Sequence, residues 1–393
     1  MSLENQVIMD EPGWENRFPM LVNRGSGRLL LIFCTSPVRP VWRHMDIAMS
    51  TRMMHSEDDG QTWSSPELLI THDGQVSPTQ PSVREGKEPV IIVPYMHWIV
   101  VPEKEKDVLT VRVPELQNPL SKEALKEAIA ISEDTLKGVE GAVEGLFITR
   151  SLDGGTSWEH RIRLDVKPFI GTGHRDSCSR MPSGRIILPL HGRRTQDKAD
   201  VSFMIFSDDD GLTWSEPVVM ACDREGEIAY HEPSILVLSN HHIIATYRIF
   251  REPHGSPRKD VPSHVDDIFF NESRDGGKTW GKPHPIGVSG HPTHMIRLQE
   301  GPILCVYGYR APPYGIRAVL STDNGRTWNT GKELILRDDA ACSDPDHVID
   351  SAIDIGYPFV TQLSDGRLMA VYYFNVGKGR GFVAATFFSV DDF

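Results

Sequence analysis

One eight-residue motif recurs five times along the chain and limits the folds it can adopt. Each copy reads Ser-x-Asp-x-Gly-x-Thr/Ser-Trp, and the copies hold five of the 8 tryptophans. They occupy residues 56–63, 151–158, 207–214, 273–280 and 321–328. Asp can fold its carboxylate onto nearby backbone N–H groups, and Gly supplies the positive φ that a tight turn needs. We therefore expect each motif to be a structural hairpin turn, with its polar groups used inside the turn.

Segments rich in β-forming residues flank every motif, and a second turn precedes an apolar strand in most repeats. Examples are residues 182–185 before IILPL and residues 364–367 before LMAVYY. Four strands per unit, repeated at intervals, are typical of a β-propeller. Five units cover residues 17 to about 338, and a sixth begins at Gly356. Residues 6–10 would supply its missing strand and close the ring, which removes exposed sheet edges. The prediction is an all-β, six-bladed propeller of four antiparallel strands per blade, forming one domain over residues 1–393.

An insertion at residues 102–145 separates the inner and outer strands of blade 2. Ser121 is a suitable helix N-cap, and apolar residues follow it at helical spacing. We expect a small helical insertion. The sequence leaves open whether it is a surface flap, a lid over a pocket or a contact in a homo-oligomer.

Composition excludes several classes of function. With Lys+Arg 41 and Asp+Glu 54, the formal charge of −13 argues against nucleic acid as a partner. No apolar run approaches the roughly 18 residues of a membrane span. The five cysteines form no CxxC pair, and no GxGxxG opens a helix, so we expect no metal and no cofactor. The N-terminus lacks the pattern of a signal peptide, which favours the cytoplasm and leaves a periplasmic or secreted location open.

Polar residues gather where the first strand of each repeat begins, although the rest of these strands is apolar. Because first strands line the centre of a propeller, residues at one register in successive repeats should converge there. Counting back from the turns places Arg17, Gln80, Arg175, Glu232 and Tyr357 at that register, with His174, His231, His291 and His294 beside it. Core packing does not require such a polar set, so we interpret it as a candidate site.

Three arginines follow the second strands of different repeats: Arg193, Arg248 and Arg310. A guanidinium group matches a carboxylate in a bidentate way. Arginines converging on one mouth of the ring therefore favour an anionic ligand.

These repeats and inner-strand motifs resemble the sialidase, or neuraminidase, superfamily, whose repeats are called Asp boxes. Residues 16–19, Asn-Arg-Phe-Pro, are similar to the family's Phe/Tyr-Arg-Ile-Pro motif, which implies that Arg17 grips a substrate carboxylate. Residues 231–233, His-Glu-Pro, resemble Asn-Glu-Pro, which implies that Glu232 partners the nucleophile. Arg248 has the spacing of the second family arginine, and Tyr357 stands where the family has its nucleophilic tyrosine.

The chain departs from the family pattern at two positions. The third arginine is not at its usual place, and of Arg310 and Arg317 we favour Arg310. The acid/base aspartate should lie in the blade 1 loop, where Asp46 is the sole aspartate. Asp176 beside Arg175 is another candidate, and His174, His291 and His294 have the chemistry of an acid or base near neutral pH.

The sequence leaves three functions open. The first is a sialidase-like glycosidase that acts on a terminal, carboxylate-bearing sugar through Tyr357, Glu232 and the arginines. The second is a propeller lyase acting on a uronic-acid glycan, which the histidines favour. The third is a carbohydrate- or protein-binding propeller without catalysis, because a fold alone does not fix function.

Overall fold

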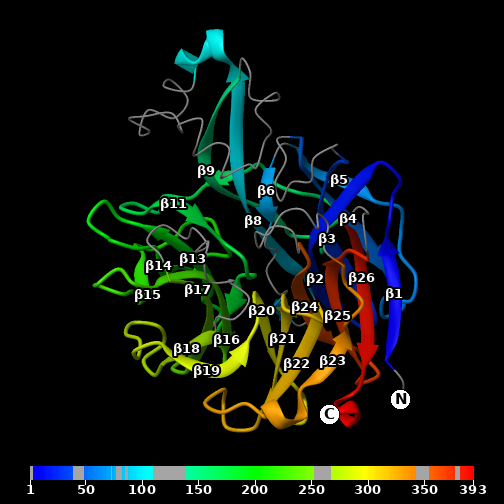
Figure 1. Cartoon of the computed structure of the whole chain (residues 1–393). Coiled ribbons are helices and arrows are strands. Elements are labelled where there is room, and N and C mark those ends of the chain that lie inside the picture. Colours follow the sequence, from blue (N-terminus) through cyan, green and yellow to red (C-terminus); the bar gives the residue numbers. More distant parts are fainter. Residues whose placement is uncertain are drawn as a thin grey trace.

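The computed structural model describes residues 3–38, 48–71, 73–76, 82–84, 87–108, 139–251, 267–341, 354–376 and 381–393. Within these residues the strands form six antiparallel sheets, the blades of a propeller (Figure 1). Three short 3-10 turns accompany them: Glu103–Glu105, Thr330–Lys332 and Val390–Asp392. In this part of the chain, no helix is long and apolar enough to cross a membrane. The all-β, six-bladed prediction is confirmed.

Blades 1 to 3 follow one another from the N-terminal side. Blade 1 contains β2 (Trp14–Gly25), β3 (Arg28–Pro37), β4 (Ser50–Ser56) and β5 (Glu67–Thr71). In blade 2, β6 (Asp73–Val76) and β7 (Ser82–Arg84) both pair with β8 (Lys87–Pro102), followed by β9 (Val139–Ser151) and β10 (Ile162–Arg163). In blade 3, β11 (Ile170–Gly173) and β12 (Ser179–Arg180) both pair with β13 (Ile186–Arg193), followed by β14 (Val201–Ser207) and β15 (Val218–Ala221).

Blades 4 to 6 complete the set. Blade 4 contains β16 (Ala229–Val237), β17 (Ile243–Phe250), β18 (Asp267–Ser273) and β19 (His284–Ser289). Blade 5 contains β20 (Thr293–Arg297), β21 (Ile303–Tyr309), β22 (Gly315–Ser321) and β23 (Leu334–Arg337). Blade 6 contains β24 (Gly356–Gln362), β25 (Leu368–Phe374), β26 (Phe382–Phe388) and, at its outer edge, β1 (Glu4–Met9).

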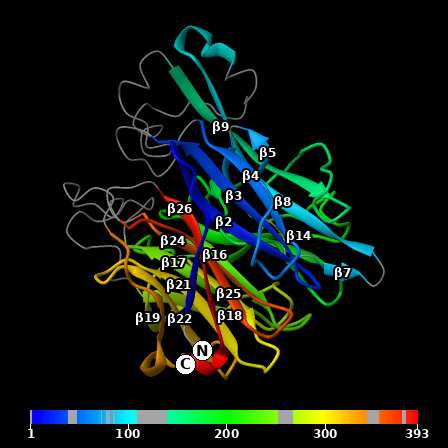
Figure 2. The same ribbon diagram turned by 90° about the vertical axis from the view of Figure 1, so that its right-hand side faces the viewer.

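The two ends of the chain meet in blade 6. β1 pairs antiparallel with β26, so the edge strand of the last blade comes from the N-terminal end. Both views place the termini side by side (Figure 2). The chain therefore runs from the outer edge of blade 6 directly into blade 1, and the inner strand of blade 6 is β24, which carries Tyr357.

The recurring motifs are hairpin turns whose polar groups bond to one another. In one of them, Ser207 Oγ donates to Asp209 Oδ1 (2.8 Å) and accepts from the N–H of Gly211 (2.8 Å). A hydroxyl further along the turn donates to the second carboxylate oxygen of the same aspartate (2.6 Å). The other four motifs make the same bonds. The expected structural role of these turns is confirmed.

The insertion in blade 2 is in part a β-ribbon. β8 continues to Pro102 and β9 starts at Val139, and the two strands pair along this extension. Figure 1 shows the ribbon projecting away from the blades. The expectation of a helical insertion over residues 102–145 is wrong at its C-terminal end, because residues 139–145 belong to β9, whereas the 3-10 turn Glu103–Glu105 follows β8 at the other end. Ser121 and the rest of residues 109–138 lie outside the described residues.

Apolar side chains pack between neighbouring blades. Ile187 and Met204 of blade 3, for example, pack with Ile243 and Tyr247 of blade 4. Burying such side chains contributes roughly 1.5–3 kcal/mol each. A similar cluster between blades 1, 2 and 6 contains Tyr357, so the apolar core itself anchors this side chain.

Candidate active site

Three inner strands carry the same irregularity, a bulge at a residue followed by proline. Strand pairing slips at Phe18-Pro19 in β2, at Glu232-Pro233 in β16 and at Tyr357-Pro358 in β24. The residue before each proline has a positive φ: 51° for Phe18, 46° for Glu232 and 47° for Tyr357. Left-handed backbone is costly for residues other than Gly, and bulges redirect side chains. The three bulges therefore turn three side chains toward the centre of the ring.

These bulges correct the register expected from the turns. Phe18, Glu232 and Tyr357 occupy the same position relative to the bulge in their strands. Arg17, which we expected at that position, lies one residue before it. The rings of Phe18 and Tyr357 meet edge to face, with centroids 5.1 Å apart. Phe18 thus supports the tyrosine by packing.

The centre of the site is a hydrogen-bonded pair from blades 6 and 4. The phenol of Tyr357 donates to Oε1 of Glu232 over 2.5 Å. Nη1 of Arg248, on the neighbouring strand β17, lies 3.3 Å from Oε2 of the same carboxylate. The tyrosine and the glutamate are 3% and 7% exposed. The predicted pair and one predicted arginine are thus in direct contact.

The surroundings of this pair set its protonation. Burial alone would raise the pKa of Glu232, but the charge of Arg248, the Tyr357 hydrogen bond and nearby His191 and Arg175 lower it to about 2. Burial, and then the negative charge of Glu232, raise the pKa of Tyr357 above its ordinary value. At neutral pH the pair is therefore a neutral phenol held by a carboxylate that can accept its proton.

Two more predicted arginines flank the tyrosine ring. The guanidinium carbons of Arg175 and Arg310 lie 5.2 Å and 5.7 Å from the ring centroid of Tyr357. Arg175 donates to the carbonyl of Pro358 (2.7 Å), and Arg310 donates to that of Ile355 (2.9 Å). These hydrogen bonds orient both guanidinium groups. Because the acceptors are neutral carbonyl groups, the bonds do not offset the positive charges.

Arg17 is held by carboxylates. Its Nη2 lies 2.8 Å from Glu15, and its Nη1 lies 3.4 Å from Asp354. Tyr373 in turn donates to Asp354. All four side chains are buried, and the ring of Tyr373 lies 5.7 Å from that of Tyr357, so this network connects Arg17 to the tyrosine of the site.

Asp176 and His294 lie deeper between the blades. Asp176 accepts from the N–H groups of Ser177 (2.9 Å) and Ile235 (3.0 Å), and burial raises its pKa. His294 Nδ1 accepts from the N–H of Val360 (3.2 Å), and its Nε2 lies 3.8 Å from Asp176. These contacts join blades 3, 4, 5 and 6, which favours a structural role for both residues.

The remaining predicted residues are distributed around this centre. His174 and His291 are buried, at 1% and 3% exposure. Arg193 lies at the end of β13, near Asp200, whose pKa its charge helps to lower. Arg317 pairs with Glu333 and stacks on another tyrosine ring, so Arg310 is the arginine that reaches Tyr357. Asp46 and Gln80 lie outside the described residues.

The sequence reasoning missed five residues of this region: Glu15, His191, Asp200, Asp354 and Tyr373. Glu15 is two residues before Arg17 and therefore on the same face of a strand, a signal that was present in the sequence. His191 on β13 and Asp200, directly before β14, reach the site by the packing of blade 3 on blade 4, which no local pattern reveals.

Comparison with known proteins supports the same architecture. The family model of the BNR repeat-like domain matches residues 115–370. Among curated proteins, no sequence matches the chain. A protein of unknown function from Dyadobacter fermentans DSM 18053 is 24% identical with a TM-score of 0.76, and 98% of each chain is covered.

Two solved glycosidase structures are more distant in sequence. The intramolecular trans-sialidase of Ruminococcus gnavus is 13% identical, with a TM-score of 0.61 over 96% of this chain and 95% of its own. The α-L-arabinofuranosidase Arb93A of Fusarium graminearum is 13% identical, with a TM-score of 0.60 over 98% of each chain. At this identity the likeness shows the propeller fold alone. Because the family model spans more than half of the sequence, the chain belongs to the BNR repeat-like family.

Proposed function

We propose that this chain is a sialidase-like glycoside hydrolase that releases a terminal sugar bearing a carboxylate. Sialic acid is the first candidate for that sugar. The contact between Tyr357 and Glu232, with arginines on both sides, carries the proposal.

The neutral nucleophile suits an anionic substrate. A carboxylate nucleophile would repel a carboxylate-bearing sugar, whereas a phenol does not. In the proposed step, Tyr357 Oη attacks the anomeric carbon while its proton passes to Glu232. The leaving-group oxygen takes a proton from an acid and departs. Water then attacks the tyrosyl-linked sugar, and the phenol regains its proton from Glu232.

The arginines would orient the substrate through its carboxylate. Arg175 and Arg310 are well placed, because each donates to a carbonyl group and has its charge over the tyrosine ring. Arg248 and Arg17 already contact carboxylates of the protein. To bind the substrate, they would have to give up those contacts for contacts with its carboxylate. Holding the carboxylate this way would fix the anomeric carbon near Tyr357.

A lyase acting on a uronic-acid glycan is the second candidate, and the histidines beside Glu232 favour it. An arginine would neutralise the uronate, and a histidine or tyrosine would remove the proton α to it. Elimination leaves a double bond in the product and adds no water.

A parallel substrate panel separates these functions. The purified protein is incubated with an aryl α-sialoside, an aryl glucuronide, a uronate oligosaccharide and an aryl α-L-arabinofuranoside, and products are analysed by mass. Because arabinose carries no carboxylate, the last substrate is the neutral control suggested by one structural neighbour. Acidic sugar released with the mass of added water supports the hydrolase. Release of an unsaturated uronate would contradict the hydrolase and support the lyase. Binding without turnover would support the non-catalytic propeller.

A further inference from the structure

A histidine–carboxylate pair lies directly beside Glu232 and has no part in the nucleophile pair. His231 Nε2 is 2.8 Å from Oδ2 of Asp200, the residue that precedes β14. The backbone carbonyl of Asp200 accepts from the N–H of Tyr230 (3.0 Å). This bond fixes the aspartate opposite β16, so the pair does not depend on a flexible side chain alone.

A second histidine joins the pair to Glu232. The ring of His191 stacks on that of His231, with centroids 4.5 Å apart, and its Nδ1 accepts from the N–H of Glu232 (3.3 Å). Burial, and then the proximity of His231, lower the pKa of His191 to about 3. His191 is therefore neutral near pH 7 and does not oppose a positive charge on its neighbour.

The pair also remains open to solvent, unlike other acid/base candidates in the described residues. The side chains of His231 and Asp200 are 15% and 13% exposed. Those of Asp176 and His294 are 2% exposed and bond to backbone groups. A group that exchanges protons with a substrate must be within its reach, so the exposed pair is better suited.

We propose that His231, oriented by Asp200, is the catalytic acid–base residue of the proposed hydrolase, and that Asp200 and His191 are positioning residues. Asp200 holds Nε2, which leaves Nδ1 to exchange the proton. This inference rests on the proposed function and names a residue type that differs from the aspartate expected by resemblance.

The proton balance is complete. As Tyr357 attacks and gives its proton to Glu232, protonated His231 gives a proton to the departing glycosidic oxygen. The neutral imidazole then takes a proton from the incoming water, and Glu232 returns its proton to the phenol. One water is consumed, and the enzyme regains its starting state.

The charges facing His231 come from several strands. Asp200 is its ion-pair partner, Glu232 is the next residue of β16, and Arg248 is its register partner on β17. The charge of Arg193 helps to lower the pKa of Asp200, and His174 helps to lower the pKa of His191. The ring of Phe250 covers another side, 4.9 Å from the imidazole.

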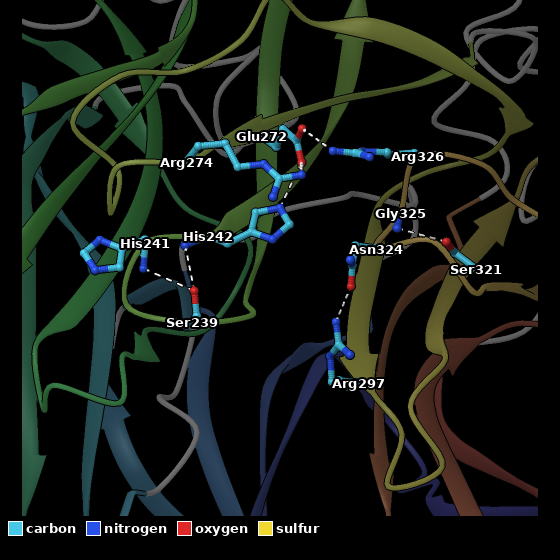
Figure 3. A network of polar contacts seen from close by, with 10 residues as sticks. All are labelled: Ser239, His241, His242, Glu272, Arg274, Arg297, Ser321, Asn324, Gly325 and Arg326. Carbon is cyan, nitrogen blue, oxygen red and sulfur yellow. Dashed lines mark hydrogen bonds and ion pairs between the residues drawn. The ribbon is translucent and has the colours of Figure 1, made fainter.

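A matched control exists at the opposite end of the same hairpin. His242 Nε2 lies 2.8 Å from Oε2 of Glu272, which also bonds to Arg274 and Arg326 (Figure 3). His242 precedes β17, whereas His231 pairs with Arg248 near the end of that strand. His242→Ala therefore removes a similar ion pair away from the proposed site.

The test compares leaving groups. Wild type, His231→Ala, Asp200→Asn and His242→Ala are assayed with an aryl and an alkyl glycoside of the acidic sugar that wild type releases. The proposal expects kcat/KM of His231→Ala to fall by roughly 10²- to 10⁴-fold for the alkyl glycoside and less than about fivefold for the aryl glycoside, which needs little acid assistance. Azide should raise its kcat on the aryl glycoside, because azide attacks without a base. Asp200→Asn should show the same pattern to a smaller extent, and His242→Ala should match wild type.

The outcomes distinguish failure of the acid–base role of His231 from failure of the proposed hydrolase activity. An equal loss for both leaving groups in His231→Ala would overturn the acid–base role and leave the hydrolase intact. Wild-type kinetics in His231→Ala would do the same. Absence of turnover by wild type on every acidic glycoside would overturn the proposed function together with this inference.

Discussion

The phenolic oxygen of Tyr357 lies 2.5 Å from Oε1 of Glu232, although 125 positions separate the two residues in the chain. One comes from blade 6 and the other from blade 4, and both sit on a bulge before a proline. Such a contact needs two strained backbones and a closed ring to hold them together. Strain at matched positions is expected where a site must be pre-organised.

Removing the phenol should abolish turnover. We expect Tyr357→Phe to lower kcat by roughly 10³-fold or more while the protein stays folded, because Glu232 keeps its contact with Arg248. Tyr372→Phe is the matched control: this tyrosine of the same blade bonds to Thr386 and lies in a different apolar cluster. Steady-state kinetics and circular dichroism check both variants. Normal activity in Tyr357→Phe would remove the tyrosine from the mechanism.

The acid limb of the pH profile should respond to Arg248. Glu232 must be ionised to accept the phenol's proton, so activity is lost as pH falls through its pKa of about 2. Arg248→Gln removes the nearest positive charge, which raises that pKa and moves the acid limb up by about one pH unit or more. The dependence of kcat/KM on pH measures it. Arg185→Gln, which breaks an exposed ion pair with Asp208, should leave the limb in place; an unmoved limb in Arg248→Gln would contradict the assignment.

Arg310 should select substrates that carry a carboxylate. Lys keeps the charge but loses the two-pronged donor geometry, so Arg310→Lys should reduce kcat/KM for the acidic substrate by roughly 10- to 100-fold. For the methyl ester of the same substrate, the substitution should reduce kcat/KM much less. Parallel assays of acid and ester measure the difference. Equal losses for both substrates would show that the carboxylate does not bind at Arg310.

The recurring turns should contribute to stability and not to catalysis. Ser207 is 2% exposed and bonds to both Asp209 and Gly211. Ser207→Ala leaves these partners unsatisfied and should lower the free energy of unfolding by about 1–3 kcal/mol, with kcat unchanged at low temperature. Urea denaturation measures the loss, with the exposed Ser183→Ala as control. Lost activity in a fully folded Ser207→Ala would give the turn a further role.

The repeat made most of the fold predictable, because each turn motif marks the same place in a blade. The register of the inner strands was less accessible. Counting from the turns placed Arg17 beside Glu232 and Tyr357, whereas aligning the prolines at 19, 233 and 358 gives the observed equivalence. A bulge inserts residues without changing the pattern of apolar strands, so counting alone misses it.

The polar site was predictable in its members more than in their roles. Glu232, Tyr357, Arg175 and Arg310 do converge. Asp176 was a catalytic candidate by its neighbour in the sequence, yet its carboxylate bonds to a backbone N–H 59 positions away. Contacts of that kind depend on how blades pack, and a single sequence carries no local trace of them.

The most direct test of the account is to trap the sugar on the enzyme. Wild type and Tyr357→Phe are mixed with a fluorinated acidic glycosyl fluoride, which slows hydrolysis of the intermediate, and analysed by intact-protein mass and peptide mapping. The account predicts one added sugar on the wild type, located at Tyr357, and none on the variant. Turnover without any adduct, giving a product that lacks the mass of added water, would contradict the hydrolase and its nucleophile.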